Sequence, residues 1–331
     1  MRHKLVILTT RFGTNFSGGA KATCEVFSRI QNQFESITVL GTEIGNHQIK
    51  NVKFIKTNYW IDALFKIMRL KDDCTIFYGD FYNAFLLGVA QAPFVFTYHD
   101  NWPELSKLNT KSYFQNLFFN TVYTYIFKKA KALVAVSNFK RINLIQYEEK
   151  LHFISNGFSR GNQECIKEHK SRQVLMVGNI DERKYNLAIK LFDLLKVHDG
   201  ISIDIYGHIV NKDLAKKLKS YPFVEIKGFV ENVPYSAYKL LLHTSFSESF
   251  GLVFYESIYN ETPVLTFNTG GAPEIISTEN GRMVDAFNIK DMYRVLKEML
   301  ANPFKANSQT VDSYSWDRAS SNYLKLFQYV D

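Results

Sequence analysis

The chain has 331 residues, more than one hydrophobic core comfortably serves, so its length predicts two domains of roughly 150 residues each. Hydrophobic residues make up 46% of the chain and charged residues 22%, a globular composition that excludes an intrinsically disordered protein. The formal net charge of +8 lies wholly in residues 1–155, with 19 Lys and Arg against 11 Asp and Glu, whereas residues 156–331 hold 21 of each kind.

Short apolar runs alternate with helix-length segments through the N-terminal half. A first run at residues 4–10 leads into a loop with Gly18 and Gly19, which opens a helical pattern. Further apolar runs cover residues 36–42, 51–57, 73–80, 93–100 and 132–137. The alternation predicts a parallel sheet covered by helices, in a first domain of residues 1–157.

The alternation pauses at residues 151–158 and resumes after a polar linker at residues 162–173. Apolar runs then cover residues 174–180, 201–207, 224–230, 240–246 and 262–267, with helical patterns at 187–196, 212–221 and 292–300. A second domain is therefore expected at residues 171–312. The fold class is α/β, with two Rossmann-like doubly wound domains facing across a cleft that is the default ligand site. Residues 315–331 predict a capped amphipathic helix, which can pack on either domain, including back on the first.

The stretch SESFGLVFYES, residues 247–257, holds two glutamates, Glu248 and Glu256, eight residues apart. Its first part reads as a loop that ends at Gly251, and a helical period starts directly after it. A helix N-terminus offers free N–H groups and a partial positive charge, which suit a phosphate, while carboxylates accept hydrogen bonds from hydroxyls. The stretch predicts a ligand with a phosphate between two polyols, which is the shape of a nucleotide-sugar.

The segment SFSESFGLVFYESIYNETPVLTFNTGGAPEII, residues 245–276, resembles glycosyltransferase family 4, the retaining nucleotide-sugar transferases of the GT-B fold. It carries the two glutamates, the Phe-Gly-Leu turn, the Pro-Val strand and the Gly-Gly-x-Pro-Glu loop of that family, and the likeness covers nearly the whole chain. The resemblance implies a hexosyltransferase that moves a sugar to an acceptor hydroxyl with retention at the anomeric carbon. A UDP-sugar is the favoured donor because of its frequency in the family, and GDP-mannose stays open.

The resemblance also assigns roles to residues of the second domain. Glu248 is expected to hold the hydroxyls of the transferred sugar and Glu256 those of the ribose. The backbone amides of Phe250, Gly251 and Leu252 are expected to meet the diphosphate.

A second donor-binding segment is VGNIDERKYNLAI, residues 177–189, whose second residue is the family's glycine, Gly178. Lys184 falls on a lysine that neutralises the leaving diphosphate in the family. The family's arginine is replaced here by Asn179, and Arg183 is the candidate to compensate, with an ordinary surface charge as the alternative interpretation.

Two features of the first domain complete the expected site. Gly18 and Gly19 match the family's glycine pair, where the backbone can approach a phosphate or the acceptor closely, although such a pair alone is more often an ordinary turn. His99 ends an apolar strand where the family places a histidine near the transferred sugar, and Asp100 is a weaker neighbour. The expected catalytic residues are thus His99, Lys184 and Glu248.

No metal or other cofactor is expected. The sequence has no Asp-x-Asp and no His or Cys cluster with ligand spacing, so Lys184, Arg183 and helix dipoles are expected to balance the diphosphate charge. No residue is an obvious covalent nucleophile, so we adopt the family's same-face mechanism, in which the leaving phosphate helps to deprotonate the acceptor. The glutamate pair is not a glycosidase pair.

The acceptor is expected to be a saccharide, a lipid-linked or a protein-linked group in surface polysaccharide, glycolipid or glycoprotein synthesis. Residues 111–132 are helical in length, aromatic on more than one face and basic at the end, which fits either peripheral membrane contact or a buried helix. The basic residues accompany no nucleic-acid recognition motif, so no nucleic-acid partner is expected.

The expected location is cytoplasmic, with the inner face of the membrane as the alternative. The three cysteines, Cys24, Cys74 and Cys165, are far apart and odd in number, which favours a reduced compartment. No apolar run is long enough to cross a membrane, and the N-terminal run is too short for a signal peptide.

Two other functions stay open at this stage. One is a UDP-sugar epimerase, which needs acid and base residues beyond those placed above. The other is a catalytically silent subunit that supports a partner transferase, an alternative that Asn179 leaves open.

Overall fold

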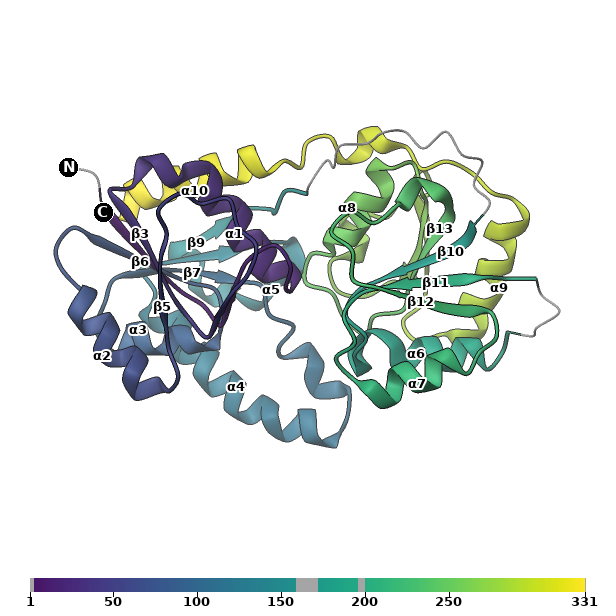
Figure 1. Cartoon of the computed structure of the whole chain (residues 1–331), viewed down its shortest axis with the longest axis horizontal. Helices are drawn as coiled ribbons and strands as arrows, with labels where there is room; N and C mark the ends of the chain where they lie inside the picture. Colours follow the sequence, from purple (N-terminus) through teal and green to yellow (C-terminus); the bar gives the residue numbers. More distant parts are fainter. Residues whose placement is uncertain (1–2, 159–171, 196–199, 331) are drawn as a thin grey trace. The chain divides into compact units, whose positions relative to one another are not determined.

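The computed structural model describes residues 3–158, 172–195 and 200–330, and it divides the chain into two compact units (Figure 1). Unit 1 comprises residues 1–157 and 314–331, and unit 2 comprises residues 158–313. Cys165 and most of the predicted linker lie outside the described residues. No helix within the described ranges is long and apolar enough to cross a membrane.

Unit 1 is built on a sheet of seven parallel strands in the order β5-β3-β1-β6-β7-β8-β9. The strands are β1 (Lys4–Leu8), β3 (Ser36–Gly41), β5 (Lys53–Lys56), β6 (Thr75–Gly79), β7 (Phe94–Tyr98), β8 (Ala132–Ala135) and β9 (Leu151–Phe153). A short pair, β2 (Arg11–Phe12) and β4 (Glu43–Ile44), stands beside the sheet. The order reverses between β1 and β6, as in a doubly wound fold, which confirms the predicted α/β class. Strand β9 was not predicted, because its three residues are at most half-buried and lack a continuous apolar run.

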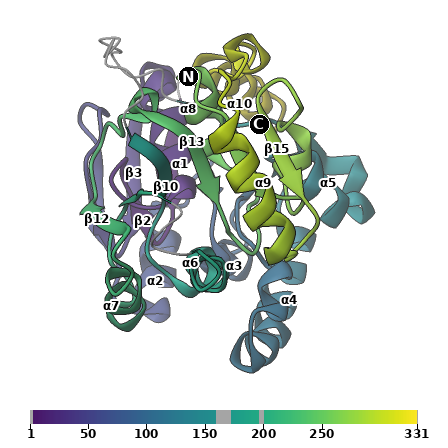
Figure 2. The same cartoon turned by 90° about the vertical axis from the view of Figure 1, so that its right-hand side faces the viewer.

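Helices cover both faces of this sheet (Figures 1 and 2). On one face lie α2 (Trp60–Leu70), α3 (Phe85–Val89) and α4 (Thr110–Lys129), whose inner side chains share a core with the strands. On the other face lie α1 (Gly18–Ile30) and the last helix, α10 (Trp316–Val330). The short helix α5 (Asn138–Asn143) follows β8. The last helix belongs to unit 1 because Ser320 Oγ donates to Val26 O of α1 at 3.2 Å, and the hydroxyls of Thr97 and Tyr323 lie 2.8 Å apart.

The two halves of α4 have different surroundings. Tyr123, Ile126 and Phe127 in its second half are buried in the core of unit 1. Its first half is exposed, including Phe114 at 64% and Leu117 at 61%. The sequence allowed either a buried or a surface helix at residues 111–132. The structure shows a buried second half and an exposed first half.

Unit 2 repeats the architecture with six parallel strands in the order β12-β11-β10-β13-β14-β15. The strands are β10 (Arg172–Val177), β11 (Ile203–Tyr206), β12 (Val224–Gly228), β13 (Tyr238–His243), β14 (Val264–Phe267) and β15 (Gly281–Val284). The order again reverses, here between β10 and β13. Strand β15 was not predicted, since it has only two apolar residues in four.

The helices of unit 2 are α6 (Glu182–Phe192), α7 (Lys212–Lys219), α8 (Leu252–Tyr259) and α9 (Ile289–Ala301). Buried residues of α6, α7 and α9 pack with β10, β11, β13 and β14 in one cluster, so these three helices cover the same face. Helix α6 begins five residues before the predicted position, because the side chain of Asp181 accepts a hydrogen bond from Lys184 N and caps the helix.

Candidate active site

The candidate site of unit 2 lies where the neighbouring strands β10 and β13 end. The chain leaves β10 into α6, whose first turn carries Arg183 and Lys184, and leaves β13 into the loop that holds Glu248. Carboxyl ends of parallel strands meet at one edge of the sheet, and the loops at an order reversal form the usual ligand site of such folds. Three sequence-predicted residues are thus brought together by topology.

The Glu248 carboxylate is the centre of a charged cluster. Its Oε1 lies 2.9 Å from Arg183 Nη1, 2.9 Å from Lys184 Nζ and 3.3 Å from His243 Nε2. The side chains of Arg183, Lys184 and Glu248 are 14–18% exposed, and that of His243 is 4% exposed. His243 was missed in the sequence because it lies inside the predicted strand 240–246, whereas the observed strand β13 ends at His243, five residues before Glu248.

The charges of the cluster set its protonation. Burial alone raises the pKa of Glu248, but the positive charges of Arg183 and Lys184 outweigh burial and hold that pKa well below its usual range. Burial lowers the pKa of His243, so the imidazole is neutral. Two mostly buried cations face a single carboxylate, and this net positive charge suits an anionic ligand.

Arg183 also holds the loop that carries Glu248. Its Nη1 donates to Ser245 Oγ at 2.9 Å and to Ser247 O at 2.7 Å, and Phe246 N donates to Arg183 O at 2.8 Å. A solvated surface charge, the alternative interpretation of the sequence, does not fit these contacts. Asn179, at the position of the family's arginine, lies in the loop before α6.

Two glycines allow backbone and side chains to approach closely around the cluster. A Cβ at Gly178, where φ is +145°, would lie 2.6 Å from Lys184 Cδ, so the missing side chain leaves room for Lys184 to cross the loop. A Cβ at Gly270, where φ is +60°, would lie 2.2 Å from Glu248 O, and Gly271 N donates to that same oxygen at 2.9 Å. The Gly-Gly loop after β14 therefore supports the backbone of Glu248.

The second half of the SESFGLVFYES stretch forms the helix that the sequence predicted. Helix α8 begins at Leu252, directly after Gly251, which has a φ of +81° and provides no side-chain cap. The ring of Phe250 stacks on Tyr255 with centroids 4.4 Å apart. Glu256 lies one turn inside the helix, and its Oε2 accepts a hydrogen bond from Tyr235 Oη at 2.8 Å. The two glutamates thus have different partners, cations for one and a phenol for the other.

The predicted residues of unit 1 meet at the carboxyl ends of its strands. Gly18 and Gly19 open α1, and a Cβ at Gly19 would lie 3.4 Å from the Cβ of His99, which follows β7. Burial lowers the pKa of His99 to about 4, so its imidazole is neutral near pH 7. Asp100 accepts a hydrogen bond from Tyr123 Oη. The glycine pair and the histidine therefore form one local site.

Asp80 is a further candidate of unit 1 that sequence reasoning missed. It follows β6, the neighbour of β7, is 4% exposed, and its Oδ2 accepts a hydrogen bond from Thr23 Oγ1 at 2.6 Å. Burial raises the pKa of Asp80 to about 6. An aspartate that ends an apolar strand run was the signal for it.

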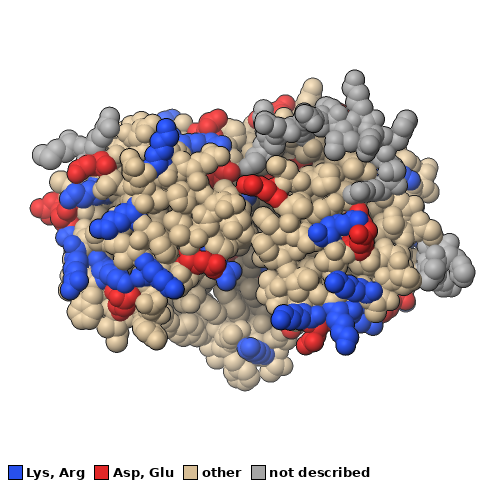
Figure 3. All heavy atoms as spheres, viewed as in Figure 1, with Lys and Arg blue, Asp and Glu red and all other residues tan. Residues whose placement is uncertain are grey.

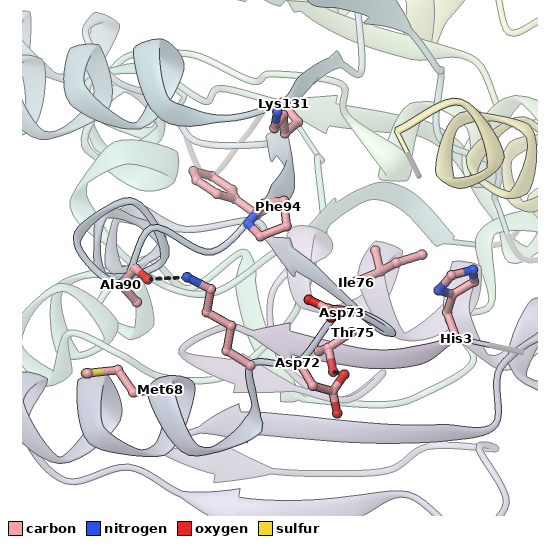
Figure 4. Close-up of a pocket in the computed structure, with 11 residues that line it drawn as sticks. His3, Met68, Asp72, Asp73, Thr75, Ile76, Ala90, Phe94 and Lys131 are labelled. Carbon is pink, nitrogen blue, oxygen red and sulfur yellow. Dashed lines mark hydrogen bonds between the residues drawn. The ribbon is translucent and has the colours of Figure 1, made fainter. Parts of the chain in front are cut away.

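A pocket of ≈ 540 Å³ lies at the opposite edge of the same sheet, by the amino ends of β6 and β7 (Figure 4). Lys71 Nζ donates to Ala90 O there at 3.2 Å, and Asp72 pairs with Lys4 at 2.8 Å. None of the sequence-predicted residues lines this pocket. Across residues 3–158, 172–195 and 200–330, no three His, Cys, Asp or Glu side chains come together as a metal site.

Two family models match the chain, one to each half. The model described as Glycosyltransferase Family 4 matches residues 25–160, and the model described as Glycosyl transferases group 1 matches residues 162–314. Together the two matches span nearly all of residues 25–314.

Curated relatives match parts of the chain. A poly(ribitol-phosphate) alpha-N-acetylglucosaminyltransferase of Staphylococcus aureus is 26% identical over 226 residues, 60% of this chain and 44% of the relative. The GtfA subunit of the UDP-N-acetylglucosamine–peptide N-acetylglucosaminyltransferase of Streptococcus parasanguinis is 30% identical over 104 residues, 29% of this chain and 21% of the relative. The chain spans less than half the length of the curated relatives it matches.

Solved structures share the fold over almost the whole chain. HepE of Anabaena, in a structure with UDP and glucose, has a TM-score of 0.75 at 16% identity, and the match covers 98% of this chain and 99% of HepE. The likeness extends through both units.

Proposed function

Because this chain belongs to the GT-B glycosyltransferases of family 4, we propose that it transfers a glycosyl unit from a nucleotide-sugar to an acceptor hydroxyl, with retention and without a metal. The observation that carries the proposal is the cluster of Arg183, Lys184 and Glu248 at the ends of β10 and β13. It combines two cations for a diphosphate with a carboxylate for sugar hydroxyls, and the uncapped N-terminus of α8 follows in the same loop.

In the proposed reaction the bond between the anomeric carbon and the diphosphate oxygen breaks, and a bond from that carbon to the acceptor oxygen forms on the same face. The acceptor proton passes to the leaving phosphate. Negative charge builds on the diphosphate as it leaves, so Lys184 and Arg183 stabilise the transition state more than the bound donor. The neutral His99 is proposed to hydrogen-bond the transferred sugar, with Gly18 and Gly19 leaving room beside it.

Glu256 is proposed to bind the ribose. Its position one turn inside α8 places it beyond the N-terminus that would hold the phosphates, and Tyr235 orients its carboxylate at 2.8 Å. The amides of Phe250, Gly251 and Leu252 are proposed to donate to the diphosphate.

The favoured donor is a UDP-sugar. HepE binds UDP in its solved structure, and the Streptococcus relative is named for UDP-N-acetylglucosamine. The Staphylococcus relative is named for transfer to a poly(ribitol-phosphate), which supports a surface polymer, glycolipid or glycoprotein as acceptor. These names support the donor class more than the acceptor.

The test is a donor screen on the purified chain in the presence of a chelator. UDP-glucose, UDP-galactose, UDP-N-acetylglucosamine and GDP-mannose are incubated separately, and released nucleotide is measured. We expect slow release from one UDP-sugar without metal. Titration of UDP then separates the alternatives, since binding without release indicates a silent subunit, and an altered sugar that keeps its nucleotide indicates an epimerase. Release that requires added metal would refute the metal-free mechanism.

A further inference from the structure

His243 has no task in the proposed function, although it belongs to the cluster around Glu248. It is the last residue of β13 and pairs with Thr266 of β14, so its backbone is fixed in the sheet. Its ring packs edge-on against Phe254 of α8, with centroids 4.9 Å apart, and 4% of the side chain is exposed. The imidazole is therefore held firmly beside the Glu248 carboxylate.

The Nε2 atom of His243 faces the carboxylate as a hydrogen-bond donor. An ionised carboxylate only accepts hydrogen bonds, and a neutral imidazole carries one N–H, so the tautomer that suits this contact has its hydrogen on Nε2. Nε2 lies 3.3 Å from Glu248 Oε1, but it makes no hydrogen bond among the residues that the structure describes. A buried donor without a partner is rare in folded proteins and destabilises the state in which it occurs.

The crowding of Glu248 Oε1 explains why this hydrogen bond does not form. Arg183 Nη1 and Lys184 Nζ both lie 2.9 Å from that same oxygen. Each oxygen of a carboxylate has two lone pairs, and two cations at this distance take up both. The N–H of His243 therefore finds no lone pair that it can approach in a favourable direction.

Binding of a diphosphate changes this competition. Arg183 and Lys184 are 18% and 14% exposed, unlike the exposed lysines of α7, whose charges water screens at the surface of unit 2 (Figure 3). A diphosphate that draws these two cations to itself leaves lone pairs of Glu248 Oε1 open to another donor. A closer approach by about half an ångström then gives His243 Nε2 the usual distance of a hydrogen bond to a carboxylate.

We propose that His243 is a positioning residue that holds Glu248 once the donor is bound, an inference that rests on the proposed function. Without a ligand the carboxylate is paired with Arg183 and Lys184. With the diphosphate in place its Oε1 accepts a hydrogen bond from His243 Nε2, and its Oε2 faces a hydroxyl of the transferred sugar. Glu248 thus exchanges its partners when the donor binds, and the buried N–H of His243 gains an acceptor in the same step.

The test is calorimetric titration of inorganic diphosphate and of UDP into the unchanged chain and into His243→Leu. Leucine removes the N–H and keeps an apolar side chain against Phe254. We expect His243→Leu to bind both ligands at least about tenfold more weakly, through the loss of one hydrogen bond to a charged group. His243→Gln is expected to recover most of the affinity, because its amide nitrogen can donate from nearly the same place.

Thermal unfolding without a ligand separates this role from a structural one. We expect His243→Leu to be at least as stable as the unchanged chain, because the substitution removes a buried donor that has no partner in that state. A variant that is less stable and yet binds diphosphate as the unchanged chain does would show a structural role, and this result overturns the proposal.

Two controls connect the effect to the Glu248 carboxylate. In a Glu248→Ala background there is no carboxylate to hold, so adding His243→Leu is expected to change the diphosphate affinity by less than about twofold. An equal loss with and without the carboxylate overturns the proposal. Lys216→Gln with Lys219→Gln removes two exposed cations of α7 and is expected to leave the diphosphate affinity unchanged.

The binding data also distinguish this inference from the proposed function. An unchanged chain that binds neither diphosphate nor UDP overturns the donor site, and the role of His243 with it. Binding of both ligands that His243→Leu leaves unchanged overturns the role of His243 alone.

Discussion

Replacing Glu248 with glutamine separates the two tasks proposed for the cluster. In the structure the Glu248 carboxylate forms ion pairs with both cations, with its Oε1 2.9 Å from Arg183 Nη1 and 2.9 Å from Lys184 Nζ. A bound diphosphate needs those same cations. The carboxylate must therefore share or release them when the donor binds, and it competes with the ligand it helps to position.

The magnitude follows from charge separation. A carboxylate and a phosphate about 6 Å apart repel each other by about 3 kcal/mol at an effective dielectric constant of about 20. Glutamine keeps an acceptor oxygen but removes this repulsion. Without a ligand the change leaves two largely buried cations unpaired, which costs roughly 3 kcal/mol of folding stability. We expect Glu248→Gln to bind UDP and inorganic diphosphate at least about tenfold more tightly, since tenfold corresponds to about 1.4 kcal/mol.

Turnover is expected to move in the opposite direction. A neutral amide holds sugar hydroxyls less well than a carboxylate, so nucleotide release from the sugar donor is expected to fall by about a hundredfold, or about 2.7 kcal/mol of barrier. Calorimetric titration with UDP and inorganic diphosphate measures the affinities, and thermal unfolding measures the stability.

The matched control is Glu256→Gln, the other glutamate of the stretch, whose partner is Tyr235. It is expected to weaken UDP by roughly 1–3 kcal/mol through the ribose and to leave inorganic diphosphate unchanged. Unchanged or weaker diphosphate binding by Glu248→Gln would refute the idea that its carboxylate occupies the diphosphate cations.

Four further predictions concern the surroundings of the site. Lys140 is fully buried and pairs with Glu104 at 2.8 Å, so Glu104→Ala should lower the free energy of unfolding, measured with urea, by about 3–5 kcal/mol. Adding Lys140→Met should restore most of this stability, and a double variant that is no more stable than Glu104→Ala would contradict the pairing. Burial holds the pKa of His99 at about 4 against 6.5 for a free histidine, so the unfolded chain binds the proton first. Stability should then fall between pH 6.5 and pH 4 in the unchanged chain and less steeply in His99→Gln, as urea midpoints would show. Burial raises the pKa of Asp80 to about 6, so above that pH its buried negative charge destabilises the fold. Asp80→Asn should therefore raise the free energy of unfolding by up to about 3 kcal/mol at pH 8 and by little at pH 4. An effect of the same size at both pH values would argue against a buried charge. Gly270→Ala forces a Cβ to within 2.2 Å of Glu248 O, so calorimetry should show weaker UDP binding, and an unchanged affinity would remove the Gly-Gly loop from the site.

Much of the fold could be predicted from the sequence, because short apolar runs that alternate with helix-length segments are typical of a parallel sheet covered by helices. Every predicted strand overlaps a strand of the structure, and the loop ending at Gly251 is followed by a helix as expected. The missed strands are β9 and β15 of the main sheets and the two-residue strands β2 and β4, which are all short and partly exposed and so form no continuous apolar run. Each of the two strands at the sheet edges is defined by its pairing with a neighbour, β9 with β8 and β15 with β14. Such pairing is visible only in the folded sheet.

The helix α4 illustrates a second limit of sequence reading. Its apolar residues occupy opposite sides of the helix, so no single face stands out from the spacing alone. Which side enters the core depends on β6, β7 and α3, and only the folded unit shows that Tyr123 and Ile126 are inside while Phe114 and Leu117 are outside.

The sequence by itself was enough to pick out Lys184, Glu248 and Glu256 as candidate site residues. Each lies in a short local motif, and its charge suggests what it binds. Only the tertiary structure decided which of them meet. Arg183 and Glu248 are 65 residues apart, and they meet because β10 and β13 are neighbours at the reversal of the strand order. The same pairing brings His243 to Glu248 and makes Arg183 a support of the loop. Contacts between distant segments depend on strand order, which local spacing does not encode.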